Sequence, residues 1–238
     1  DAVCHERLRP ADDGTDFGLC VPRDLLDVEL VETVREHGAE VREGCTVEDV
    51  LWRAGRACGV RYRDAGGETR ELGAKLVIGA DGRRSTTAGL VGAWTPYRVS
   101  RNGRGLVFRY LEDAQPEAVT DGIERQWREG DSFAFLFPSA PYGRVLVLFM
   151  GHRDEVREAR RDPEGYWARK LEEHRDLAER LEGATPVTKL RSTGETPAFF
   201  RASTGPGWAL AGDAGHFKDP VTGQGMRDAL WAGRTLAE

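Results

Sequence analysis

The last quarter of the chain places a carboxylate where it could bind a ligand. Asp213 follows the short apolar run from Trp208 to Ala211 and lies between Gly212 and Gly215. An ionised carboxylate accepts hydrogen bonds from two neighbouring hydroxyl groups, so an aspartate at the end of a strand can hold a polyol. The small residues around it predict a turn whose backbone a ligand or another segment of the chain can approach closely.

A helix start follows this aspartate. Gly223 and Gly225 precede a helical pattern from Met226 to Leu236. The free N–H groups and the dipole of a helix start attract an anion or the anionic edge of a ring. Together with Asp213, this order of residues favours a binding site over the alternative, a glycine-rich surface loop.

A second acid follows another apolar run earlier in the chain. Lys75 to Ala80 ends in small residues and leads into Asp81-Gly82-Arg83-Arg84-Ser85. A continuous apolar run is typical of a strand buried on both faces of a parallel sheet. Nucleotides bind outside the carboxyl ends of such strands. The alternative is a tight turn in which Asp81 and Gly82 supply positive φ angles, and the motif alone leaves both interpretations open.

The first half of the chain predicts one helix and a small meander. The helix runs from Arg23 to His37, because Pro22 precedes its apolar pattern and Gly38 ends it. Short β-like runs follow at 40–42, 45–52, 57–63 and 72–78. Glycines punctuate these runs as turns, so Val47 to Arg70 is predicted to form an antiparallel meander.

Longer strands occupy the middle of the chain and charged helices follow them. The strands are expected at 105–110, 132–137 and 145–150. Phe133, Phe135 and Phe137 alternate with smaller residues, so they line one face, either as core or as the wall of a pocket for a flat organic substrate. The segment 152–181 is predicted to be helical with a break at 162–165, and its charge pairs indicate a solvated surface.

Composition excludes several classes of protein. The 238 residues are 39% hydrophobic, which suffices for one large domain or two small ones. No apolar run approaches the roughly 20 residues that span a bilayer. A formal net charge of −6 with interspersed signs argues against nucleic-acid binding. These exclusions are compatible with a small-molecule partner, and the oligomeric state is left open.

The cysteines carry no metal-binding pattern. Cys4, Cys20, Cys45 and Cys58 form no C-x-x-C pair, and residues 1–9 show no signal-peptide pattern. We therefore expect no metal site and reduced thiols in a cytoplasmic protein.

The two motifs together resemble a known family. The segment 212–225, with Asp213, His216-Phe217-Lys218-Asp219-Pro220 and Gly223-Gln224-Gly225, preceded by 79–85, is similar to the FAD-dependent aromatic hydroxylases. These are the class A flavoprotein monooxygenases related to p-hydroxybenzoate hydroxylase. The helix that begins Pro22-Arg23-Asp24-Leu25-Leu26 also resembles a segment of this family.

The resemblance implies roles at the late motif. Asp213 would hydrogen-bond the ribityl chain of FAD, and Gly212 would allow its close approach. Pro220 would pack near the isoalloxazine ring. The helix start at Gly223, Gln224, Gly225 and Met226 would face the pyrimidine edge of that ring, where negative charge develops on reduction, in agreement with the dipole argument.

The resemblance assigns the remaining contacts elsewhere. Asp81 and Gly82 would lie near the FAD pyrophosphate and contribute indirectly to the binding of NAD(P)H. Arg23 would approach the phosphate or ribose region, and the backbone of Val47 would approach the adenine.

The implied fold is α/β, with mixed α+β character. Residues 1–90 and 195–238 would form an FAD-binding domain, a wound sheet with the inserted meander. Residues 91–194 would form a substrate-binding domain with an antiparallel sheet and flanking helices. The family's first βαβ unit, with its G-x-G-x-x-G fingerprint, has no counterpart here, and we expect roughly 80 upstream residues to supply it.

The implied activity is hydroxylation of an aromatic or polyketide-like molecule with NAD(P)H and O₂, through a flavin C4a-hydroperoxide. The flavin carries this chemistry and the protein positions the reactants, so no catalytic residue is assigned. His216, in the loop beside the flavin, is either a general base or a structural residue.

Two other flavoenzyme reactions and a non-enzymatic role remain as alternatives. Phe135-Leu136-Phe137-Pro138 resembles a run in reductases of the geranylgeranyl type. The second alternative reaction is that of a halogenase, although the Trp-x-Trp-x-Ile-Pro signature of halogenases does not occur in this sequence. The non-enzymatic alternative is a binding module or truncated remnant without the cofactor.

Overall fold

The computed structural model describes residues 10, 12–101, 103–115, 125–140, 143–194 and 196–238. The chain forms two compact units. Unit 1 comprises Asp1–Ala39, Leu106–Gly151 and Glu155–Ser192, and unit 2 comprises Glu40–Gly105, His152–Asp154 and Thr193–Glu238. The predicted α/β class with mixed α+β character is confirmed. The described residues before Glu40 belong to unit 1, whereas the sequence analysis placed them in the FAD-binding domain. That functional division stays a prediction.

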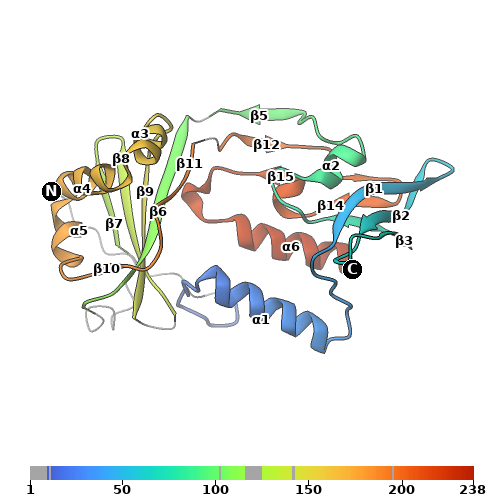
Figure 1. Cartoon of the computed structure of the whole chain (residues 1–238), viewed down its shortest axis with the longest axis horizontal. Helices are drawn as coiled ribbons and strands as arrows, with labels where there is room; N and C mark the ends of the chain where they lie inside the picture. Colours follow the sequence, from blue (N-terminus) through green and yellow to red (C-terminus); the bar gives the residue numbers. More distant parts are fainter. Residues whose placement is uncertain (1–9, 11, 102, 116–124, 141–142, 195) are drawn as a thin grey trace. The chain divides into compact units, whose positions relative to one another are not determined.

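Unit 1 is built on a six-stranded sheet of order β10-β6-β9-β8-β7, with β11 also paired to β6 (Figure 1). The pairs β7–β8, β8–β9 and β10–β6 are antiparallel. The strand bounds are β6 Arg104–Glu112, β7 Arg125–Glu129, β8 Ser132–Pro138, β9 Arg144–His152, β10 Thr185–Pro186 and β11 Arg191–Thr193. The three long strands expected from the sequence are therefore present.

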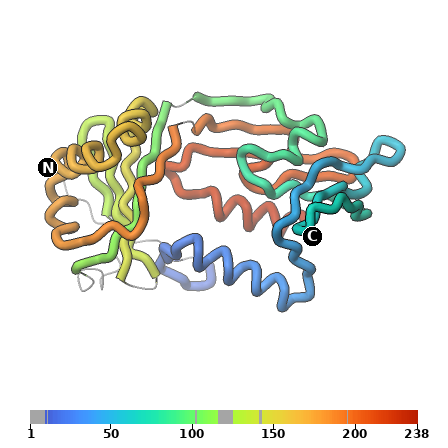
Figure 2. Tube along the Cα trace, in the orientation of Figure 1, coloured from blue at the N-terminus to red at the C-terminus, as the bar shows by residue number. Residues whose placement is uncertain are grey.

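Helices cover one face of this sheet (Figure 2). They are α3 Glu155–Arg161, α4 Pro163–Glu173 and α5 Arg175–Arg180. The predicted break at 162–165 is the start of α4, where the Asp162 side chain accepts from the Gly165 N–H and Pro163 takes the first helical position. Ala134, Leu136, Val147 and Phe149 face these helices within one buried cluster.

The phenylalanine stripe lies on the other face of β8. Phe135 is buried, and its ring stacks on Phe133 at 6.3 Å and on Phe137 at 5.9 Å between centroids. In the antiparallel register Phe135 lies opposite Leu148, and Phe133 lies opposite Met150. The stripe thus forms a continuous apolar face with its neighbours on β9.

Helix α1, Arg23–Glu36, has the predicted start, but its apolar side chains are not covered. Pro22 is the N-cap residue, and no residue of the helix is buried. Leu25, Val28 and Leu30 are all more than two-fifths exposed.

Unit 2 contains the predicted meander. Its strands are β1 Thr46–Arg53, β2 Arg56–Arg63 and β3 Thr69–Gly73, paired antiparallel in that order. The run at 40–42 is not a strand, and the run at 72–78 divides between β3 and β4, Val77–Gly79. Residues 74–76 separate the two strands, and the Ala74 N–H still donates to the Cys58 carbonyl on β2 at 2.8 Å.

A short parallel pair forms the centre of unit 2. Strand β4 pairs in parallel with β14, Trp208–Leu210, which pairs on its other side with β13, Thr204–Gly205. Val77, Trp208 and Leu210 join a buried cluster with the meander and with α2, Thr86–Leu90.

The prediction that the first of these strands is buried on both faces is wrong. Ile78 is 47% exposed and Leu76 is 40% exposed. Strand β4 lies at the edge of its three-stranded sheet, and only the face that carries Val77 packs against the meander. The alternation of burial follows from the period of two in a strand.

A third sheet and the last helix complete unit 2. The sheet has the order β15-β12-β5, formed by His216–Phe217, Ala198–Phe200 and Arg98–Ser100. Two 3₁₀ turns, Gly212–Ala214 and Pro220–Thr222, flank β15 and lead to α6, Gly225–Ala237. The helix predicted from Met226 to Leu236 is confirmed.

Three further features bear on the expectations from composition. In the described ranges, no helix combines the length and the apolar character that crossing a membrane requires. The same residues contain no cluster of three His, Cys, Asp or Glu side chains that could hold a metal ion. Cys20, Cys45 and Cys58 form no disulfide bond among the described residues, and Cys4 lies outside them.

A buried histidine in unit 1 predicts acid sensitivity. His174 is 2% exposed, and its Nε2 lies 3.2 Å from the Ser132 hydroxyl, which also accepts from Lys170. Burial, and then the Lys170 charge, lower the pKa of His174. The unfolded chain therefore takes up a proton that the folded chain resists, so the free energy of unfolding should fall as pH drops from about 6.5 towards that lowered pKa.

Urea unfolding at pH 7 and pH 5 measures this effect. His174→Gln should flatten the dependence, whereas the exposed His37→Gln should leave it as in the wild type. Parallel pH profiles for wild type and His174→Gln would assign the acid sensitivity to other groups.

Candidate functional site

The two motifs lie side by side at the carboxyl ends of β4 and β14. Leu210 pairs with Gly79 in the parallel register, and the Ala211 N–H donates to the Gly79 carbonyl at 2.9 Å. The loops that carry Asp81 and Asp213 therefore leave the same edge of the sheet. Residues 132 positions apart in the sequence are brought together by one strand pair.

Asp81 is fully engaged within its own loop. Its carboxylate accepts from the Ser85 hydroxyl at 2.5 Å, from the Thr87 N–H at 2.9 Å and from the Thr87 hydroxyl at 3.1 Å. Burial would raise the pKa of Asp81, but these hydrogen bonds outweigh it and hold the pKa below its usual value. Gly82 follows with a φ of +76°. Asp81 thus fastens the turn to the start of α2, where Ser85 is the N-cap.

Replacing this carboxylate should destabilise the fold. Asp81→Ala leaves the buried hydroxyls of Ser85 and Thr87 without their acceptor. An unsatisfied buried polar group costs about 1–3 kcal/mol, so we expect a loss of about 2 kcal/mol in the free energy of unfolding. Urea denaturation measures it, with Glu71→Ala on the exposed strand β3 as the control. A loss no larger than that of the control would contradict the role.

Asp213 is the opposite case. It is half-buried, and within the described part of the chain no N–H or O–H donates to its carboxylate. Burial raises the pKa of Asp213, while the charges of Arg83 and His216 lower it in part. A half-buried carboxylate with unfilled acceptor positions can receive hydroxyl groups from a ligand.

The start of α6 lies beside this carboxylate. A Cβ on Gly225 would stand 3.9 Å from the Asp213 Oδ1 atom, so the first residue of the helix lies close to the carboxylate. Gln224, the N-cap residue, provides no side-chain hydrogen bond to the helix start. The N–H groups of the first turn therefore remain available to a ligand.

Gly212 allows a close approach, but to a part of the chain. Its φ is +55°, and a Cβ there would stand 3.1 Å from the Cβ of Ala229 on α6. The sequence predicted that Gly212 makes room for a ligand. The structure shows that Gly212 packs closely against α6, which brings the helix start near Asp213, and its approach to a ligand stays a prediction.

Ion pairs fix the loop between the late turn and α6. Asp228 on α6 binds the Lys218 ammonium at 2.6 Å and lies 3.5 Å from the His216 Nε2. No sequence motif singles out Asp228, because Lys218 and His216 become its neighbours only when the loop folds back. Arg104 bonds to Asp219 at 3.1 Å, and the Asp219 side chain caps the turn that begins at Pro220.

His216 has structural contacts on both sides of its ring. The ring stacks on Phe200 with centroids 5.8 Å apart and planes within 7°. Its Nε2 faces Asp228. The ring stacking fits the structural alternative for His216, and its role as a base stays untested.

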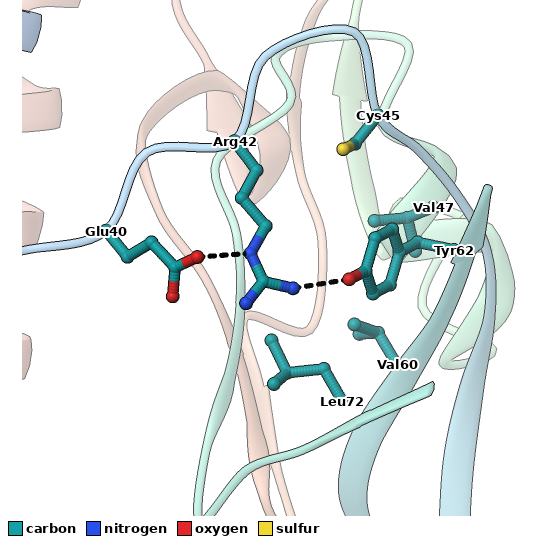
Figure 3. Close-up of a pocket in the computed structure, with 7 residues that line it drawn as sticks. All are labelled: Glu40, Arg42, Cys45, Val47, Val60, Tyr62 and Leu72. Carbon is teal, nitrogen blue, oxygen red and sulfur yellow. Dashed lines mark hydrogen bonds and ion pairs between the residues drawn. The ribbon is translucent and has the colours of Figure 1, made fainter. Parts of the chain in front are cut away.

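The predicted adenine contact lies at a small cavity on the meander. Val47 lines a cavity of about 310 Å³ (Figure 3). Its other lining residues are Glu40, Arg42, Cys45, Val60, Tyr62 and Leu72. Arg42 donates to the Tyr62 hydroxyl and also pairs with Glu40 at 2.6 Å, so one side is polar and the rest is apolar. Such a mixture is typical of ligand pockets, and this one is at the small end of their ~300–1,000 Å³ range.

The remaining residues that were predicted to contact the cofactor lie at exposed positions or in turns. Arg23 lies in unit 1, is exposed, and forms an i,i+4 ion pair with Asp27 at 2.7 Å. Gly223 has a φ of +62° and ends the turn that Pro220 begins, and Met226 is 56% exposed. Whether Arg23 reaches a ligand stays a prediction.

Sequence comparisons identify relatives over nearly the whole chain. A family model described as the FAD binding domain matches residues 5–238. Digeranylgeranylglycerophospholipid reductase 2 of Methanopyrus kandleri is 30% identical over 226 residues. That match covers 93% of this chain and 55% of the relative, so the chain spans little more than half of the relative's length.

Solved structures share the fold. The myxobacterial chondrochloren halogenase CndH superposes with a TM-score of 0.81 at 25% identity, over 92% of this chain and 51% of that one. Aklavinone-11 hydroxylase, solved in a ternary complex with FAD and aklavinone, superposes with a TM-score of 0.69 at 21% identity, over 91% and 40% of the two chains.

Proposed function

Because the chain belongs to the FAD binding domain family, we propose that Asp213 and the first turn of α6 hold the ribityl chain and the flavin ring of FAD. The observation that carries this proposal is the half-buried Asp213 carboxylate, to which no described residue donates a hydrogen bond. Two hydroxyl groups of a ribityl chain can fill its acceptor positions. The group therefore fits the residues that are present.

The helix start supplies the second half of this fit. The N–H groups of Gly225 and Met226 carry the positive end of the α6 dipole. They favour negative charge at the pyrimidine edge of a flavin, so they stabilise the reduced ring more than the oxidised one. Gln224 and Gly223 shape the turn that presents these groups, and Pro220 would pack near the ring.

The meander cavity and the early loop fit the other end of the cofactor. Val47 and the cavity beside it would receive the adenine, with Arg42 on the polar side. Asp81 and Gly82 would act indirectly near the pyrophosphate, since the Asp81 carboxylate is already engaged by Ser85 and Thr87.

We infer that the whole protein hydroxylates a flat aromatic or polyketide-like molecule. FAD, when bound, accepts electrons from NAD(P)H and makes O₂ reactive towards such a substrate. The stacked rings of Phe133, Phe135 and Phe137 offer an apolar wall of the kind that binds flat molecules. A likeness in fold to a hydroxylase that binds FAD and aklavinone supports this choice.

A reductase acting on an isoprenoid alkene is the second candidate. It is favoured by the similarity to digeranylgeranylglycerophospholipid reductases, which spans almost all of this chain. The partly exposed side chains of Phe133, Phe137 and Leu148 on this apolar face suit a hydrocarbon chain as well as a ring.

Two assays on the purified full-length protein separate these reactions. A yellow protein that absorbs near 450 nm establishes the bound flavin. Hydroxylation predicts that a phenolic compound accelerates NAD(P)H oxidation with matching O₂ consumption. Reduction of an isoprenoid alkene without O₂ would instead support the reductase, the second candidate. A colourless protein that does not take up FAD would overturn both proposed reactions.

A further inference from the structure

Arg201 is a buried cation in unit 2 that bonds to backbone carbonyls. It follows β12 directly and is 5% exposed. Its Nε donates to the Trp94 carbonyl at 2.9 Å, and its two terminal nitrogens donate to the carbonyls of Ala214 at 3.0 Å and Arg83 at 3.2 Å. The guanidinium also lies over the rings of Trp94 at 4.4 Å and Phe199 at 4.3 Å.

Two of these three carbonyls belong to the paired motif loops. Ala214 is adjacent to Asp213, and Arg83 is two residues beyond Asp81. The Arg201 backbone reinforces the link, because its N–H donates to the Gly215 carbonyl at 2.8 Å. One side chain therefore spans the two turns that follow β4 and β14.

The geometry suits arginine and no other residue type. A guanidinium presents five donors in a fixed plane, and the three carbonyls take donors from three different nitrogens. Burial lowers the pKa of Arg201, and the negative charge of Asp81 offsets part of this lowering. A lysine at this position offers a single nitrogen and cannot reach all three acceptors at once.

We propose that Arg201 is a positioning residue that sets the distance between the two motif loops and so aims the Asp213 carboxylate at its ligand. It acts through the Ala214 and Arg83 carbonyls and does not touch the ligand. This inference rests on the proposed FAD site. No motif contains Arg201, because its role depends on two loops that are distant in the sequence.

The test compares two buried arginines in the full-length protein. Arg201→Lys removes the planar guanidinium group with its three donor nitrogens and keeps the positive charge. Arg109→Lys is the matched control, because Arg109 is 2% exposed, lies 4.6 Å from the Trp167 ring and bonds to Glu164 within unit 1. Both variants should lower the urea midpoint, so stability alone does not decide the question.

FAD affinity and backbone protection decide it. We expect Arg201→Lys to raise the Kd for FAD on the order of tenfold and to shift the visible spectrum towards that of free flavin, with Arg109→Lys close to wild type. In ligand-free protein, amide exchange should accelerate at both 82–85 and 212–216 in Arg201→Lys only.

Each contrary result has a distinct meaning. A wild-type Kd and unchanged exchange in Arg201→Lys would overturn the inference, as would equal weakening by Arg109→Lys. Failure of the wild type to bind FAD would overturn the proposed function, and the exchange data would still decide whether Arg201 links the two loops.

Discussion

Asp213→Ala should weaken FAD binding by the full-length protein on the order of 100-fold. The variant removes the acceptors for two ligand hydroxyls, and a hydrogen bond to a charged group contributes about 1.5–3 kcal/mol. Two such bonds correspond to roughly 100-fold or more in Kd. Because no described side chain or N–H depends on this carboxylate, the free energy of unfolding without ligand should hardly change. Titration of apoprotein with FAD, followed by flavin fluorescence, measures the Kd.

Two companion variants identify the cause of this loss. Asp213→Asn keeps one acceptor oxygen and the shape of the side chain, so its Kd should lie between those of wild type and Asp213→Ala. Asp49→Ala removes a carboxylate that forms an ion pair with Arg61 on the meander, and it should leave the Kd for FAD unchanged. If Asp213→Ala binds FAD like the wild type, the carboxylate does not hold the ribityl chain.

Acid should weaken the same interaction. Burial raises the pKa of Asp213, so the carboxylate becomes protonated at a higher pH than an exposed aspartate does. The protonated group accepts hydrogen bonds less strongly. We expect the Kd for FAD to rise as pH falls towards that raised pKa, and Asp213→Asn to lack this dependence.

Local patterns predicted the elements of the site well. Val77–Gly79 and Trp208–Leu210 both lie within short apolar runs predicted as strands, and they form a parallel pair. The meander and α6 follow from turn glycines and helical periodicity in the same way. What local patterns missed is burial, as Ile78 shows, because an apolar residue is buried only where another element covers it.

The two aspartates look alike in the sequence and differ in the structure. Asp81 accepts hydrogen bonds from hydroxyls four and six residues further on, whereas Asp213 is followed by Ala214 and Gly215, which carry no hydroxyl group. That contrast was available in the sequence, since Ser85 and Thr87 follow Asp81. Arg201 and Asp228 were not, because each acts on groups that only the folded loops bring near.

A second large effect is expected in the buried ion pair of unit 1. Arg180, at the end of α5, donates to both carboxylate oxygens of Asp113 at 2.8 Å and 2.7 Å. The two side chains are 5% and 1% exposed. Burial would raise the pKa of Asp113, but the bonds from Arg180 and the Gln115 N–H outweigh it and hold the pKa below its usual value. The pair fastens the end of β6 to α5.

Asp113→Ala should therefore cost about 3–5 kcal/mol of unfolding free energy, because it leaves the Arg180 charge buried without a partner. Losing that much removes a large part of a typical domain's stability, which is about 5–15 kcal/mol. Urea denaturation measures the loss of unfolding free energy. Asp113→Asn takes the place of Asp113→Ala if the alanine variant does not fold. The double variant Asp113→Leu with Arg180→Met removes both charges and should recover most of the loss. If the double variant is as unstable as Asp113→Ala, the cost lies in packing, and the uncompensated charge is not its cause.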